Sequence, residues 1–162
     1  MARGEKIVLK TPEQAAKMRA AGVVLARALG AMRDAVAVGV STSDLDAIAR
    51  DVIGAAGGKP TFDRYRADPG DPPFIGAICS SVNEEVVHGI PNRKRKLTEG
   101  DVISIDCGVT LDGWIADSAF TAIVGEGREE DRRLLEVTEG SLERCIREAC
   151  HPGKRLFDLA FA

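Results

Sequence analysis

The sequence lacks the features that mark membrane, secreted and disulfide-bonded proteins. It has no apolar run of about 18 residues, so it predicts no transmembrane helix. Its first residues, MARGEKIVLK, are charged and lack the apolar core of a secretory signal. The four cysteines show no CxxC spacing, and without an export signal we expect reduced thiols in a cytoplasmic protein. There is no internal repeat and no low-complexity segment.

The composition is typical of one globular domain. Of the 162 residues, 44% are hydrophobic and 29% are charged, and the formal net charge is −3. A chain of this length can bury about two thirds of its unfolded surface, which is enough for a core. The mild negative charge gives no support for a DNA-binding protein.

Two amphipathic helices are predicted in the first third of the chain. Thr11-Pro12-Glu13-Gln14 has threonine at the N-cap, proline at the first helical position and glutamine three residues after the cap. Ser41 or Thr42 can cap the second helix, and Gly57-Gly58 ends it. The apolar positions of the first helix are Ala15, Met18, Ala21, Leu25, Leu29, Met32 and Val36.

Three further elements are predicted at the ends of the chain. Residues 6–9 (KIVL) have the composition of a short edge strand. A third helix runs from about Glu129 to Cys150, and Leu156 to Phe161 begins another. The apolar face of the third helix comprises Leu134, Leu135, Thr138, Leu142, Cys145, Ile146 and Ala149.

A β-hairpin is the central feature of the sequence. Val102 to Asp106 and Trp114 to Val124 are rich in strand-forming residues, and Asp112-Gly113 between them is typical of a type I′ turn. With these two residues as the loop, Leu111 pairs with Trp114.

That register brings two carboxylates together. Asp106 then lies opposite Ala119, and Asp117 is its diagonal neighbour on the same face, about 7–8 Å away. Such a pair repels unless a cation lies between them, and hard divalent cations accept carboxylate oxygens. Spacing alone leaves a second interpretation open, in which one aspartate caps a turn and the other is solvated.

Three motifs resemble a known family. CSSVNEEVVHGIP, LTEGDVISIDCG and DGWIADSAFTAIVG together resemble type I methionine aminopeptidase, one of the pita-bread metallopeptidases. The resemblance is ungapped from Cys79 to Gly125 and extends more loosely from Thr11 to the end of the chain. It implies an α+β, creatinase/aminopeptidase-like fold in which helices cover an antiparallel sheet. It also implies the removal of N-terminal methionine from nascent proteins.

The resemblance assigns roles to individual residues. Asp106 and Asp117 match metal ligands, the second of which bridges two metals in that family, and His88 matches a histidine that contacts the substrate near the scissile amide. The cofactor is one or two divalent ions, with Co, Mn, Fe and Zn not distinguished. The pocket for the methionine side chain is expected to be lined by Phe62, Tyr65, Phe74 and Cys79. The match is firmer for Phe74 and Cys79, because ADPGDP looks like an insertion after Tyr65.

One departure from the family pattern concerns the remaining ligands. The family completes its metal site with a histidine and two glutamates from its second half, and a further histidine assists catalysis. The chain stops at Ala162 before any of them, and its other histidine, His151, matches none. We therefore expect residues 1–162 to be a truncated catalytic domain that is inactive alone. Its expected parts are a helical cover at about 11–57, a pocket loop at about 59–79, a metal hairpin at about 101–124 and a third helix at about 129–150.

The basic run Arg93-Lys94-Arg95-Lys96 has two interpretations. A solvated loop is favoured, because no aromatic residue interleaves the run to stack on bases. The alternative is contact with ribosomal RNA, since phosphate attraction needs only clustered cations. For the whole chain, one alternative to an aminopeptidase is a non-catalytic pita-bread module that binds protein or RNA, and another is a non-functional fragment.

Overall fold

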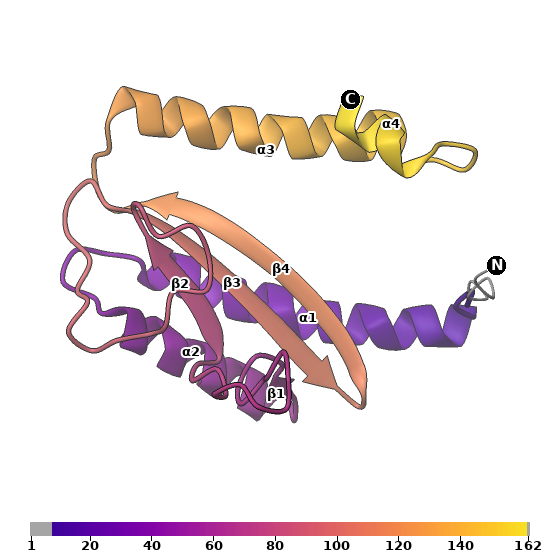
Figure 1. Cartoon of the computed structure of the whole chain (residues 1–162), viewed down its shortest axis with the longest axis horizontal. Coiled ribbons are helices and arrows are strands. Elements are labelled where there is room, and N and C mark those ends of the chain that lie inside the picture. The colour runs from indigo at the N-terminus through magenta and orange to yellow at the C-terminus, as the bar shows by residue number, and fades with distance from the viewer. Residues whose placement is uncertain (1–7, 162) are drawn as a thin grey trace.

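The protein is described by a computed structural model covering residues 8–161, in which two helices pack on one face of a small antiparallel sheet (Figure 1). The elements in chain order are α1 (Pro12–Ala35), α2 (Thr42–Ala55), β1 (Lys59–Pro60), β2 (Ile78–Val82), β3 (Val102–Leu111), β4 (Trp114–Ile123), α3 (Glu129–Ala149) and α4 (Leu156–Phe161). Of the predicted edge strand, residues 6 and 7 lie outside the described residues. Residues 8 and 9 are not in a strand, so that prediction is wrong for them.

The N-termini of α1 and α2 are both closed by capping boxes. Thr11 caps α1 together with Gln14, as predicted. Of the two candidates for α2, Ser41 is the cap: its side chain accepts a hydrogen bond from the backbone N–H of Asp44, and Asp44 accepts from the Ser41 backbone N–H. Each box satisfies backbone donors that would otherwise lack partners at a helix start.

Strand β3 is the centre of the sheet. One of its edges pairs with β4 along its whole length, and the other pairs with β2 and then β1, all antiparallel. The turn between β3 and β4 is the predicted one, since Asp112 and Gly113 both have positive φ, 48° and 79°. Leu111 is paired with Trp114, which confirms the predicted register.

The core lies between this sheet and the two N-terminal helices. Alternate residues of β3 point into it, and the residues between them lie on the opposite face of the sheet. The fully buried core side chains include Met32, Leu45, Ile53, Ile78, Ile103, Ile105 and Val109.

The buried face of α1 differs in part from the predicted one. Ala21, Leu25 and Met32 are buried as expected, but Met18 is 40% exposed and Val24 is buried instead. The cause is visible in Figure 1, where the first turns of α1 extend past the end of the sheet.

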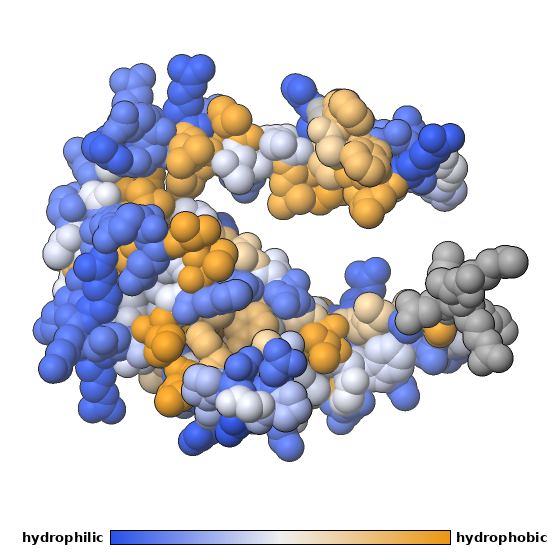
Figure 2. All heavy atoms as spheres, viewed as in Figure 1, coloured by the Kyte–Doolittle hydropathy of each residue, from blue (hydrophilic) through white to orange (hydrophobic). Residues whose placement is uncertain are grey.

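The apolar face predicted for α3 has little cover within the described residues. Leu134, Leu142 and Ile146 are 63%, 60% and 54% exposed, and only Ala149 of the predicted set is buried. Figure 2 shows apolar side chains gathered along α3 and α4, which stand apart from the sheet. Among the described helices, none is both long enough and apolar enough to cross a membrane.

Candidate functional site

The two aspartates occupy the relative positions that the hairpin pattern predicts. Asp106 on β3 faces Ala119 on β4, and Asp117 faces Gly108, two residues further along β3. Because side chains two apart on a strand share a face, both carboxylates lie on the sheet face opposite the α1–α2 layer. The metal interpretation requires both acids to lie close together on one face, and the structure meets this condition.

Asp117 influences the ionisation of Asp106. Burial raises the pKa of Asp106, and the charge and hydrogen-bonding proximity of Asp117 raise it further. His88 and the backbone N–H of Cys107 act in the opposite direction, but more weakly. Among residues 8–161, neither carboxylate forms an ion pair with a basic side chain. The pair is thus a concentrated negative charge that this part of the chain leaves uncompensated.

Cys79 lies beside the acid pair. It is the direct cross-strand partner of Asp106 in the β2–β3 pair. Its side chain is buried, and burial followed by the charges of Asp106 and Asp117 raises the pKa of the thiol to about 11. The thiol therefore stays protonated beside the acids and adds no further negative charge near neutral pH.

His88 lies on the loop that runs along the outer edge of β2. It is exposed and has a φ of 59°, in the left-handed region that histidine adopts more often than most residues other than glycine. Gly89 holds the loop in place, because its carbonyl accepts from the Ser80 N–H at 2.8 Å and its N–H donates to Ser81 Oγ at 3.2 Å. A Cβ on Gly89 would stand 2.3 Å from the Ser80 carbonyl oxygen, so only glycine permits this approach.

The loop between β1 and β2 brings the predicted aromatic residues together. The backbone N–H of Phe74 donates to the Tyr65 carbonyl at 2.8 Å, and Arg64 N–H donates to the Phe74 carbonyl at 2.9 Å. A Cβ on Gly76 would lie 3.0 Å from the Phe74 ring and 2.9 Å from Pro91 Cδ, so the ring lies beside the segment that follows His88. Phe62 and Phe74 are half-buried, whereas Tyr65 is 60% exposed.

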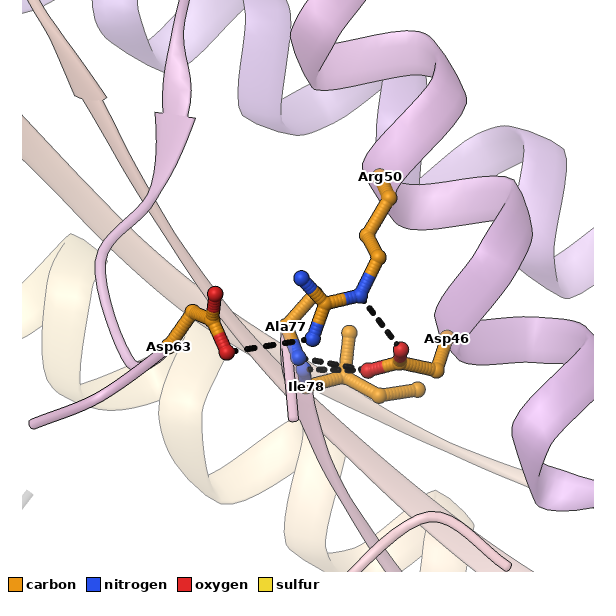
Figure 3. Close-up of polar contacts among 5 residues, drawn as sticks. All are labelled: Asp46, Arg50, Asp63, Ala77 and Ile78. Carbon is orange, nitrogen blue, oxygen red and sulfur yellow. Dashed lines mark hydrogen bonds and ion pairs between the residues drawn. The ribbon is translucent and has the colours of Figure 1, made fainter. Parts of the chain in front are cut away.

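A polar network anchors this loop, and the sequence reasoning missed it (Figure 3). Asp46 on α2 accepts hydrogen bonds from the backbone N–H groups of Ala77 and Ile78, at the beginning of β2. Arg50 donates to Asp46 at 2.7 Å and to Asp63 at 3.2 Å. The only signal in the sequence was the i, i+4 spacing of Asp46 and Arg50 on one helix.

The basic run Arg93–Lys96 lies beside the N-terminus of α2. All four side chains are exposed, and the backbone carbonyl of Arg95 accepts from the Thr42 N–H at 3.1 Å. Asp44 is close enough that Lys96 and Arg93 contribute to lowering its pKa, after the hydrogen bonds from Ser41.

The donor set can be tested for its fit to a metal ion. Two adjacent carboxylates supply hard oxygen donors, which suit divalent cations. Among residues 8–161, no group of three or more His, Cys, Asp or Glu side chains is placed to hold a metal. The acid pair therefore fits one part of a coordination sphere.

Comparison with known proteins agrees with this geometry. The model for metallopeptidase family M24 matches residues 16–162. Methionine aminopeptidase 1 of Bacillus subtilis is 44% identical over 156 residues, which are 96% of this chain and 60% of that protein. The chain thus spans about 60% of the length of the curated relatives it matches.

Solved structures show the same architecture. Methionine aminopeptidase from Thermotoga maritima superimposes with a TM-score of 0.87 at 37% identity, covering 96% of this chain and 59% of that one. Prolidase from Pyrococcus furiosus, at 17% identity and a TM-score of 0.71, shares the fold; the match covers 86% of this chain and 38% of that one. The predicted α+β pita-bread fold, with helices on an antiparallel sheet, is confirmed, and the chain corresponds to part of that fold.

Proposed function

This chain belongs to metallopeptidase family M24, and on that premise we propose that it provides the N-terminal part of a methionine aminopeptidase active site. Family membership implies the use of a divalent metal ion. The reaction is hydrolysis of the peptide bond after an N-terminal methionine of nascent proteins, which takes place in the cytoplasm. The observation that carries the proposal is the acid pair Asp106–Asp117, which the hairpin register brings together on the sheet face opposite α1 and α2.

Asp106 and Asp117 hold one or two divalent ions, of which Co, Mn, Fe and Zn are the candidates. A divalent ion in such a site supplies a nucleophilic water near neutral pH and polarises a carbonyl group. Burial and then the charge of Asp117 raise the pKa of Asp106, and a cation between the two acids would offset the second of these effects. Removing the cation should therefore leave a pair that takes up a proton more readily.

The remaining residues bind and orient the substrate. His88, on the loop beside β2, donates a hydrogen bond to the amide next to the attacked carbon. Phe74 and Cys79 line the pocket for the methionine side chain, together with Phe62 and Tyr65. Methionine suits such a pocket because its thioether is polarizable and makes favourable contacts with aromatic rings.

The test is an assay of the protein as its gene encodes it. With Mn²⁺ or Co²⁺ present, the peptide Met-Ala-Ser should release free methionine, and Leu-Ala-Ser should be cleaved far more slowly. The variant Asp117→Asn should abolish release of methionine. If the wild-type protein binds Mn²⁺ but cleaves neither peptide, the aminopeptidase assignment is wrong.

A second candidate function is the binding of RNA phosphates by Arg93–Lys96, whose four side chains are exposed. Contact with ribosomal RNA would place the enzyme where new chains emerge. Changing all four residues to serine should then weaken co-sedimentation with ribosomes without changing peptide hydrolysis. Unchanged co-sedimentation would leave the run as a solvated loop. A purely RNA- or protein-binding module is disfavoured, because such a module has no need of the paired acids.

A further inference from the structure

Gly108 occupies a position on β3 that the mechanism above does not use. It follows Asp106 by two residues, so a side chain there would point from the same face of the sheet as the acid pair. Its cross-strand partner on β4 is Asp117. Its backbone carbonyl accepts from Thr61 N–H at 2.8 Å on the other edge of β3. In an antiparallel sheet the N–H and C=O of one residue point to the same edge of its strand, so Gly108 and Asp117 form a non-hydrogen-bonded pair. The facing Cα atoms of such a pair are only about 4.5 Å apart.

The space that a side chain at position 108 would fill is taken by the pocket loop. A Cβ on Gly108 would stand 2.9 Å from Phe62 Cε1 and 2.9 Å from Thr61 Cβ. Both distances are shorter than carbon atoms tolerate without movement of one partner. The edge of the Phe62 ring thus rests on the bare backbone of Gly108, the residue that faces Asp117 across the β3–β4 pair.

The residues on both sides of Phe62 are held in place. Thr61 is held by its backbone hydrogen bond to Gly108 and by a side-chain hydrogen bond to Thr110 at 2.9 Å. On the other side of Phe62, Asp63 is held by Arg50 at 3.2 Å (Figure 3). Phe62 therefore lies between two anchored residues, one tied to β3 and the other to α2. A new methyl group at position 108 has to displace the ring rather than the backbone around it.

We propose that Gly108 is a specificity-determining residue: its missing side chain admits the Phe62 ring to the acid face of the sheet, where the ring forms the wall of the substrate pocket next to the metal ligands. This inference rests on the proposed function, since it concerns the pocket for the first residue of the substrate. Gly108 acts through Phe62 and is a positioning residue. Any side chain at position 108 pushes the ring away from the sheet and into the space of the methionine side chain.

The test compares steady-state kinetics of variants of the protein as its gene encodes it. Gly108→Ala should raise KM for Met-Ala-Ser by about tenfold, the effect of a mis-shaped apolar pocket, with kcat changed less than about twofold. The affinity for Mn²⁺ measured by calorimetry should stay unchanged, because the acid pair keeps its register. Gly140→Ala is the matched control, since a Cβ at this α3 position meets no atom of residues 8–161 within 4 Å; its KM should equal that of the wild type.

A double-mutant cycle separates this role from a general effect on folding. In the background Phe62→Leu, the contact with the ring is removed and only the contact with Thr61 remains, so Gly108→Ala should raise KM by a smaller factor than it does in the wild type. Additive increases in the double variant would overturn the inference, as would an unchanged KM in Gly108→Ala. A loss of kcat and Mn²⁺ affinity without a rise in KM would also overturn it. Absence of methionine release by the wild-type protein would instead contradict the proposed function, so the two failures are distinguishable.

Discussion

The backbone carbonyl of Tyr65 accepts a hydrogen bond from the N–H of Phe74 at 2.8 Å, although residues 66–73 separate the two in the chain. A second hydrogen bond, from Arg64 N–H to the Phe74 carbonyl at 2.9 Å, closes the base of this excursion. Residues 66–72 are exposed, and the pair of bonds makes the segment a self-contained loop. The two aromatic residues thus lie side by side in spite of the apparent insertion ADPGDP.

This closure predicts that the loop can be shortened. Replacing residues 66–73 by Asn-Gly, which suits a two-residue turn, should lower the free energy of unfolding by less than about 1 kcal/mol, because the segment buries little apolar surface. Urea denaturation of the 162-residue chain measures the change. A loss above about 3 kcal/mol would show that the loop stabilises the fold.

The acid pair predicts a specific loss of metal affinity. Asp117→Asn and Asp106→Asn each remove one charged oxygen donor, so the affinity of the gene-encoded protein for Mn²⁺ should fall by at least about 100-fold. Asp112→Asn is the control, because it removes the same charge from the turn of the same hairpin, where asparagine also accepts a positive φ. Equal losses in all three variants would point to long-range charge rather than to coordination.

The hydrogen bonds of Asp46 predict a structural role away from the metal ligands. Asp46→Ala leaves the N–H groups of Ala77 and Ile78 without their acceptor at the start of β2. The free energy of unfolding should fall by about 2–3 kcal/mol, measured by urea denaturation. Asp51→Ala on the exposed side of α2 should change it by less than about 0.5 kcal/mol.

The hairpin is the part of this molecule that could be predicted best. Its register depends on local chemistry, because Asp112 and Gly113 both adopt the positive φ that the turn requires. That register alone brings Asp106 and Asp117 onto one face. The role of Asp46 could not be predicted, because the two N–H groups that donate to it are 31 and 32 residues away in the chain and meet it only in the folded state. The fit of Phe62 against Gly108 depends in the same way on the packing of two distant segments.

Sequence patterns also did not predict which apolar positions of the helices are buried. The apolar periodicity of α3 correctly predicted a helix, but periodicity does not identify what covers its apolar face. Leu134, Leu142 and Ile146 remain more than half exposed in the described residues. Similarly, the apolar spacing of α1 could not show that Met18 is 40% exposed whereas Val24 is buried.

The cysteines predict an ordered pattern of thiol reactivity. Burial, and to a smaller extent Asp106 and Asp117, raises the pKa of Cys79 to about 11, and burial raises that of Cys107 to about 12. Because only the thiolate reacts, Ellman's reagent at about pH 8 should modify the exposed Cys150 first and leave Cys79 and Cys107 unmodified until the protein unfolds. Asp106→Asn should increase the rate at Cys79, because it removes one of the charges that disfavour the thiolate. Rapid modification of Cys79 in the native wild-type chain would contradict this arrangement.

The 162-residue chain assayed on its own should hydrolyse Met-Ala-Ser poorly or not at all. Among its described residues, no group of three or more His, Cys, Asp or Glu side chains is placed to hold a metal, and two carboxylates fill only part of the coordination sphere of a divalent ion. Calorimetry should accordingly show weak Mn²⁺ binding to the chain, which Asp117→Asn weakens further. The decisive comparison is methionine release by this chain and by methionine aminopeptidase 1 of Bacillus subtilis at equal concentration with excess Mn²⁺. Equal turnover, lost in Asp117→Asn, would mean that two aspartates suffice for catalysis and that the expected dependence on further ligands is wrong.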